Sequence, residues 1–119
     1  MFDHVQIKVR DFKESRTFYE AVLKELGYGV VFEDVGVVGF GNTPHDMFEI
    51  RQADTDIPLS KSVHGAFVAK SKEAVDTFHK TALAHGAKDN GAPGLREYEE
   101  GYYAAFVIDP DGHNLEAVF

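Results

Sequence analysis

The sequence of 119 residues contains no cysteine. This absence excludes disulfide bonds, thiolate metal sites and cysteine nucleophiles, and it fits a reducing compartment. No apolar run approaches the roughly 20 residues that a membrane-spanning helix needs. The first residues, Met1 to His4, begin a strand pattern and do not have the features of a signal peptide. We therefore expect a soluble, cytoplasmic protein with no membrane partner.

Basic residues are also scarce, with 12 lysines and arginines against 20 aspartates and glutamates and a net charge of −8. Such an acidic chain repels polyanions, so a nucleic-acid partner is not expected. The same acidity suits a divalent cation. A phosphate-binding loop is missing as well, because the segment from Gly36 to Gly41 has neither the Walker lysine nor the dinucleotide-binding spacing.

The chain does contain a clear order of strands and a helix in its first half. Polar and apolar residues alternate from His4 to Arg10, which predicts a half-buried strand. Residues from Lys13 to Leu26 have helical spacing, and Gly27 is placed to cap that helix. Short strands separated by turn residues are then predicted over Tyr28–Glu33, Gly36–Phe40 and Asp46–Arg51.

The same order begins again after a polar segment. Val63–Ala69 is predicted as a strand, and Lys72–His85 is predicted as a helix that ends at Gly86. Aligning His64 with His4 also aligns Phe78 with Phe18, which indicates an internal repeat. We predict one α+β domain of two tandem βαβββ modules, with module one at residues 1–52, a linker at 53–62 and module two at 63–119.

Module two contains a segment without any period, from Lys88 to Gly101. Its glycines and its proline predict a long loop, which would form the mouth or the lid of a pocket. Arg96 and Tyr98 lie in this segment. A strongly apolar strand is predicted after it, over Tyr102–Ile108.

Each module has one histidine at the start of its first strand and one glutamate inside its last strand. Taken singly, such residues are usually solvated or hydrogen-bonded. Because side chains alternate across a strand, all four face away from the apolar residues that pack under the helices. Two imidazoles and two carboxylates can bind zinc, nickel, cobalt, manganese or ferrous iron with positions left open for substrate. The predicted metal ligands are His4, Glu49, His64 and Glu116.

Other polar residues are weaker candidates. Arg51 lies on the same strand face as Glu49 and could bind an anionic group. His113 follows Asp111-Gly112 in a turn, where we expect an exposed side chain. His79 is expected on the flank of the second helix.

Two motifs are similar to those of one superfamily. His4 to Asp11, followed by Ser15-Arg16-Thr17-Phe18-Tyr19, resembles the opening of the vicinal oxygen chelate superfamily. Residues 109–116, Asp-Pro-Asp-Gly-His-Asn-Leu-Glu, resemble its closing signature. The superfamily includes glyoxalase I, bleomycin-resistance proteins, fosfomycin-resistance transferases and extradiol dioxygenases. The resemblance implies two βαβββ modules whose curved mixed sheets form a cup, and a homodimer with two equivalent sites at its interface.

The resemblance also implies roles for individual residues. His4, Glu49, His64 and Glu116 fall on the four metal-ligand positions of glyoxalase I, where the ligands come from both subunits. The carboxylate at the Glu116 position is the base that moves the proton there, and Glu49 is the alternative base. The substrate contacts proposed for this chain are Arg51, Arg96, Tyr98 and Tyr103.

These observations predict a divalent-metal-dependent enzyme of glyoxalase type. It would act as a lyase or isomerase on a small substrate that chelates the metal through vicinal oxygens. One alternative is a metal-independent binding or resistance protein that holds an apolar or aromatic small molecule. The other is a ferrous dioxygenase, since that class uses two histidines and one glutamate.

Overall fold

The computed structural model describes residues 1–119. The chain forms two compact units. Unit 1 comprises residues 1–24 and 28–60, and unit 2 comprises residues 25–27 and 61–119. Each unit contains one helix and four strands. Neither helix is long and apolar enough to cross a membrane.

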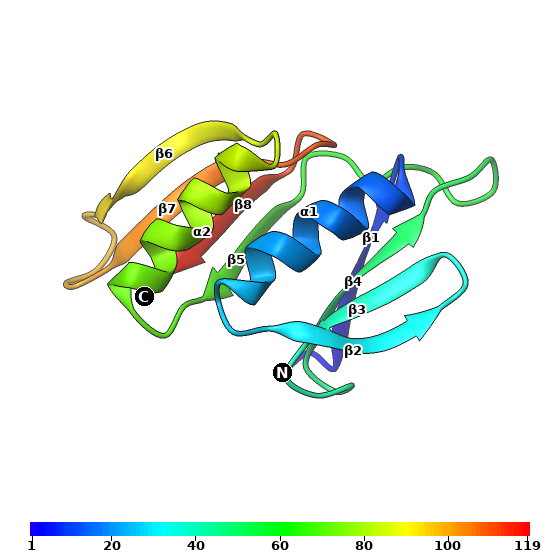
Figure 1. Ribbon diagram of the computed structural model, residues 1–119, viewed down its shortest axis with the longest axis horizontal. Helices are drawn as coiled ribbons and strands as arrows, with labels where there is room; N and C mark the ends of the chain where they lie inside the picture. The colour runs from blue at the N-terminus through cyan, green and yellow to red at the C-terminus, as the bar shows by residue number, and fades with distance from the viewer. The chain divides into compact units, whose positions relative to one another are not determined.

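Unit 1 is a four-stranded sheet with one helix across one of its faces (Figure 1). Its strands follow the order β1-β4-β3-β2, in which β1 is parallel to β4 and the other pairs are antiparallel. The elements of this unit are β1 (His4–Val9), α1 (Phe12–Lys24), β2 (Gly29–Asp34), β3 (Val37–Gly41) and β4 (Met47–Gln52).

The core of unit 1 lies between α1 and the sheet. Ile7 and Val9 on β1 are buried, and so are Phe18 and Val22, which are one helical turn apart on α1. The Oδ1 atom of Asp11 accepts a hydrogen bond from the backbone N–H of Glu14 at 3.1 Å, which satisfies one of the free amides at the start of α1. Alternation in the strand and a 3.6-residue period in the helix therefore direct the same apolar residues into one layer.

Unit 2 has the same arrangement, with the strand order β5-β8-β7-β6 and α2 across one face (Figure 1). β5 is parallel to β8, and the other pairs are antiparallel. The two similar βαβββ modules confirm the predicted α+β fold. The elements of this unit are β5 (His64–Val68), α2 (Lys72–Ala84), β6 (Lys88–Leu95), β7 (Tyr103–Ile108) and β8 (Asn114–Val118).

The prediction of one long loop from Lys88 to Gly101 is wrong in its first half, because residues 88–95 form the edge strand β6. The pairing of β6 with β7 shifts register between Asp89 and Gly91, and again between Gly91 and Gly94. Gly91 has a φ of 151°, which residues with a side chain rarely adopt. A bulged edge strand tolerates glycine and proline, so its sequence resembles that of a loop.

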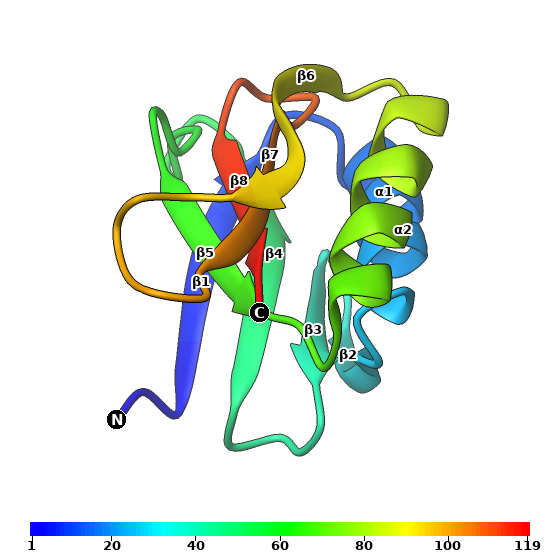
Figure 2. The ribbon, with the colours of Figure 1, turned by 90° about the vertical axis from the view of Figure 1, so that its left-hand side faces the viewer.

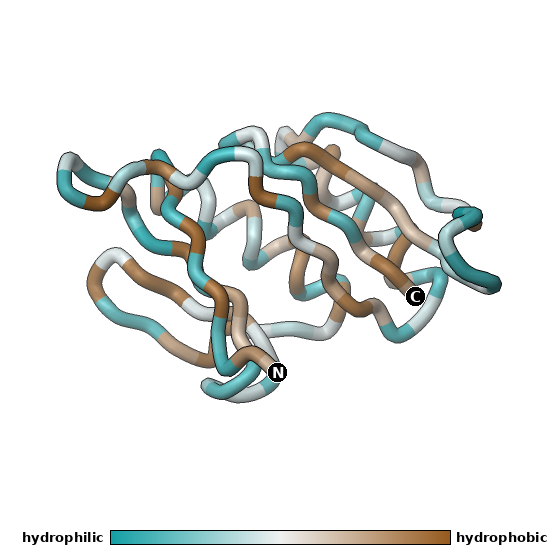
Figure 3. The backbone as a smooth tube through the Cα atoms, turned by 180° about the vertical axis from the view of Figure 1, so that it is seen from behind, coloured by the Kyte–Doolittle hydropathy of each residue, from teal (hydrophilic) through white to brown (hydrophobic).

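Residues 96–102, which include the rest of that segment, form the loop between β6 and β7. This loop lies on the side of the sheet away from α2 (Figure 2). It is strongly hydrophilic, in contrast to the mostly hydrophobic strand β7 that follows it (Figure 3). The backbone N–H of Arg96 donates to the carbonyl of Tyr102 at 2.8 Å, which closes the base of the loop.

The expectation that His113 is exposed is also wrong, since its side chain is fully buried. Its Nδ1 accepts a hydrogen bond from the backbone N–H of Val63 at 3.1 Å and thereby connects the starts of β8 and β5. Its own backbone N–H donates to Oδ1 of Asp109 at 2.8 Å. The turn places His113 at the entrance of a buried strand, and its burial follows from that position.

Candidate functional site

Both modules place a histidine and a glutamate in the same register. In unit 1, Gln6 of β1 lies opposite Glu49 of β4, and His4 precedes Gln6 by two residues on the same face. In unit 2, Ala66 of β5 lies opposite Glu116 of β8, and His64 again precedes by two residues. Each histidine is therefore the diagonal neighbour of its glutamate, a distance that long side chains can bridge.

The pair in unit 2 is in direct contact. Nε2 of His64 lies 3.3 Å from Oε2 of Glu116. Glu116 is only 4% exposed. The other carboxylate oxygen, Oε1, accepts a hydrogen bond from the hydroxyl of Tyr102. This bond to a carboxylate, together with burial, raises the pKa of Tyr102 to about 12, so the phenol remains a donor at neutral pH.

Hydrogen bonding determines which nitrogen of His64 is free. Nδ1 lies 3.0 Å from the carbonyl oxygen of Asn114, and because a carbonyl only accepts, Nδ1 must carry a proton. In the neutral imidazole, Nε2 then keeps a free lone pair 3.3 Å from Oε2 of Glu116. Two electron-rich atoms this close repel each other, and a proton or a cation bound to them would relieve the repulsion.

The pair in unit 1 is built from different partners. Glu49 is 5% exposed, and its Oε2 accepts a hydrogen bond from Nε2 of Gln6 at 2.7 Å. Gly39 is the cross-strand neighbour of Glu49, and a Cβ at that position would lie 2.7 Å from the sulfur of Met47. A side chain at Gly39 would therefore displace Met47, and its Cβ would also lie 3.4 Å from Cγ of Glu49.

His4 is also oriented through its Nδ1, which lies 2.9 Å from Oδ1 of Asp3. Because the carboxylate accepts, Nδ1 carries the proton and Nε2 is the available ligand atom. The bond to Asp3, and the charge of Glu49, raise the pKa of His4. The second oxygen of Asp3 binds Nδ1 of His45 at 2.8 Å, and both bonds lower the pKa of Asp3.

The four predicted substrate contacts occupy different surroundings. Arg51 is exposed on β4, two residues from Glu49 and on the same face. The hydroxyl of Tyr103 donates to Oδ1 of Asp76 on α2 at 2.6 Å, so Tyr103 lies on the helix-covered face of its sheet. Glu116 lies on the other face, since it contacts Tyr102, the neighbour of Tyr103.

The other two predicted contacts belong to the loop between β6 and β7. The guanidinium of Arg96 donates to the carbonyls of Ala92 at 2.7 Å and Gly94 at 2.9 Å. It also lies 5.4 Å from the centre of the Phe106 ring. The ring of Tyr98 packs edge-on against the ring of Tyr102 at 5.3 Å. Arg96 is therefore engaged in holding the loop, whereas Tyr98 supports the residue that binds Glu116.

Three hydrogen-bond partners of the site were missed by sequence reasoning, namely Asp3, Gln6 and Tyr102. Alternation in β1 gives the signal for Gln6, because it faces the same side as His4. No group of three or more histidine, aspartate or glutamate side chains is placed to hold one metal ion. Each unit supplies two such donors.

A sequence model of the glyoxalase/bleomycin resistance protein/dioxygenase superfamily matches residues 1–117. The chain belongs to this superfamily. The fold is similar to that of a glyoxalase/bleomycin resistance protein from Albidiferax ferrireducens T118, with 31% identity and a TM-score of 0.87 over 99% of this chain and 98% of that one.

Two further crystal structures show the glyoxalase-like fold at lower identity. A glyoxalase/bleomycin resistance protein/dioxygenase family enzyme from Burkholderia phytofirmans PsJN is 21% identical, with a TM-score of 0.75 over 98% of this chain and 95% of that one. A glyoxalase-related enzyme from Fulvimarina pelagi is 17% identical, with a TM-score of 0.76 over 100% and 87%. No curated protein matches the chain.

Proposed function

We propose that the protein is a divalent-metal-dependent enzyme of glyoxalase type that acts as a lyase or isomerase. Its substrate would be a small molecule that chelates the metal through two vicinal oxygens. The observation that supports this function is the repeated diagonal pair of histidine and glutamate. Both carboxylates are almost fully buried, and neither forms an ion pair with a lysine or arginine. A buried carboxylate needs a compensating charge, which a metal ion provides.

The donor set fits zinc, nickel, cobalt, manganese or ferrous iron. His4 and His64 each have Nδ1 engaged with an oxygen, which leaves Nε2 as the ligand atom in both. Glu49 and Glu116 would supply one oxygen each. A bound ion of this kind supplies Lewis acidity, which polarises the substrate oxygens and makes the hydrogen on the neighbouring carbon acidic.

Glu116 is the proposed base. The hydroxyl of Tyr102 holds Oε1, so Oε2 is the one oxygen left. It would either bind the ion or, when not bound to it, take a proton from the substrate carbon and return it to the adjacent carbon. Glu49 is the alternative base, with Gln6 in the orienting role of Tyr102. Arg51, on the face of Glu49, would contact an anionic or polar part of the substrate.

Each unit provides two ligands, and a catalytic metal usually has three or four from the protein. We propose that the pairs combine in a homodimer, in which two equivalent sites each draw on both subunits. This proposal predicts that metal binding and dimer formation are linked. Sedimentation analysis with and without the metal is the direct measurement.

The function is tested by metal analysis of chelator-treated protein after reconstitution with each candidate ion. We expect about one ion per chain and its loss in His64→Ala. His79→Ala is the matched control, because this histidine binds Asp89 at 2.9 Å and belongs to no proposed site. Less than a tenth of an ion per chain in the wild type would contradict the proposal and favour a metal-independent binding protein.

A further inference from the structure

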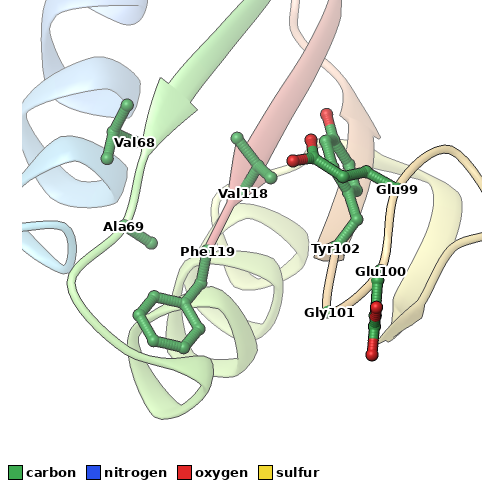
Figure 4. Close-up of a pocket in the computed structure, with 8 residues that line it drawn as sticks. All are labelled: Val68, Ala69, Glu99, Glu100, Gly101, Tyr102, Val118 and Phe119. Atoms are coloured by element: carbon green, nitrogen blue, oxygen red, sulfur yellow. The ribbon is translucent and has the colours of Figure 1, made fainter.

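Unit 2 contains a cavity of about 510 Å³ beside the β6–β7 loop (Figure 4). This volume is typical of pockets that hold small organic molecules. Val68, Ala69, Val118 and Phe119 form its apolar side. Tyr102 lines the cavity and also donates its hydroxyl to Glu116, so one side chain separates the cavity from the proposed base.

The polar side chains of the cavity offer a ligand only hydrogen-bond acceptors. Glu99 and Glu100 contribute carboxylates, and the one hydroxyl, that of Tyr102, is already donated to Glu116. The backbone N–H groups of Ala69, Tyr102 and Phe119 are bound to carbonyls of the chain itself. A ligand that binds these side chains must therefore bring its own donors.

The charge around the cavity determines which kind of hydrogen-bond donor a ligand should carry. The carboxylate of Glu99 extends beside the ring of Tyr102 toward Val118, whereas Glu100 extends away from these groups (Figure 4). No cation of the chain pairs with either glutamate. An aromatic face next to a carboxylate favours an ammonium group. The net charge of −8 further attracts cations and repels anions.

We propose that this cavity binds a small protonated amine with an apolar body. The body would lie against Val118 and Phe119, and the ammonium group would lie between Glu99 and the ring of Tyr102. Carboxylate and phosphate ligands are disfavoured by the same groups. Binding of the amine does not depend on the metal-dependent function proposed above. Only the further step, that the amine is also the substrate, rests on that function.

The test uses chelator-treated protein and three probes that share a phenylethyl body: phenethylammonium, the neutral 2-phenylethanol and the anionic phenylacetate. Titrations followed by ¹H–¹⁵N NMR should show phenethylammonium binding with shifts at the amides of Val68, Ala69 and Gly101. We expect the alcohol to bind roughly fivefold more weakly, as for one exposed ion pair, and the carboxylate to bind more weakly still.

Glu99→Gln should remove the preference for the amine over the alcohol. Glu97→Gln is the matched control, since it removes the same charge from the same loop at a residue that does not line the cavity. Equal affinities for all three probes, no binding at all, or equal effects of the two variants would overturn the proposal. Because no metal is present, this outcome is independent of the metal analysis, and either proposal can fail alone.

Discussion

The two modules share one backbone register but stabilise their buried carboxylates differently. In module one the residue opposite the carboxylate is Gln6, which donates directly to Glu49. In module two the equivalent residue is Ala66, which has no donor, and Tyr102 from the end of a loop donates to Glu116 instead. The repeat therefore preserves where the carboxylate is placed. The identity of its partner has changed, and in module two that partner also lines a cavity.

The largest effect is expected where the modules are most alike, at the buried phenylalanine of each helix. Phe18→Ala and Phe78→Ala should each lower the free energy of unfolding by about 3–5 kcal/mol, because both side chains are almost fully buried. Urea denaturation followed by circular dichroism measures the change. Leu83→Ala, at a position on α2 that is 39% exposed, is the control and should cost much less. A loss at one phenylalanine only would show that the two cores do not contribute equally.

The repeat itself was predictable because it depends on periodicity, which sequence records directly. Spacing alone predicts Ile7 and Val9 under a helix, and Phe18 and Phe78 on the apolar faces of the two helices, and all four are buried. Strand β6 was missed because Gly91 and the register shifts beside it remove the alternation that identifies a strand.

The second comparison concerns the carboxylates. Glu49→Gln and Glu116→Gln should each weaken metal binding by more than about 100-fold, since even residues that only orient a ligand typically contribute 10–100-fold. Competition with a chromophoric chelator measures the affinity. Glu97→Gln serves as the control for a change of one charge. An undiminished affinity in one of the two variants would mean that only one module binds the ion.

A smaller effect on metal affinity is expected for the hydrogen-bond donors to the carboxylates, which differ between the two modules. Gln6→Met and Tyr102→Phe each remove one hydrogen bond to a buried carboxylate while nearly preserving shape. We expect metal affinity to fall by about tenfold in each. The absorption spectrum of bound cobalt should change as well, because the freed oxygen can move. If Tyr102→Phe leaves both the metal affinity and the cobalt spectrum unchanged, packing alone orients Glu116.

These donors show where prediction from sequence ends. The four candidate ligands were identifiable because the same residue types recur at matching positions of the repeat. Tyr102 could not be identified as the partner of Glu116, because that contact depends on the path of the loop before it. Asp3 was missed for another reason: its position beside His4 gives no information about which ring nitrogen it binds.

The smallest effect concerns the links from each helix to its edge strand. α1 is linked to β2 by Arg16 and Glu33, and α2 is linked to β6 by His79 and Asp89. The bond to His79 is the main cause that lowers the pKa of Asp89 below 3.8. A lowered carboxyl pKa adds stability above about pH 4, and this stability is lost as the pH falls through the folded-state value.

Asp89→Asn should therefore lower the thermal midpoint slightly near pH 6, and this effect should shrink as the pH falls below about 4. Melting curves of the variant and the wild type across this range measure the difference. Glu33→Gln tests the corresponding link in module one. A difference for Asp89→Asn that does not vary with pH would show that the carboxylate of Asp89 acts through packing and not through its charge.

The irregular strand β6 has a consequence for the behaviour of the protein at high concentration. An unpaired strand edge is a template on which another chain can add a strand, and this is a common route to aggregation. The register shifts around Gly91 interrupt the even spacing of the outer amides and carbonyls, and Pro93 has no amide to offer. A straight incoming strand therefore finds no continuous row of partners along β6. The glycines and the proline that hide this strand from sequence analysis also protect this edge of the sheet in module two from edge-to-edge association.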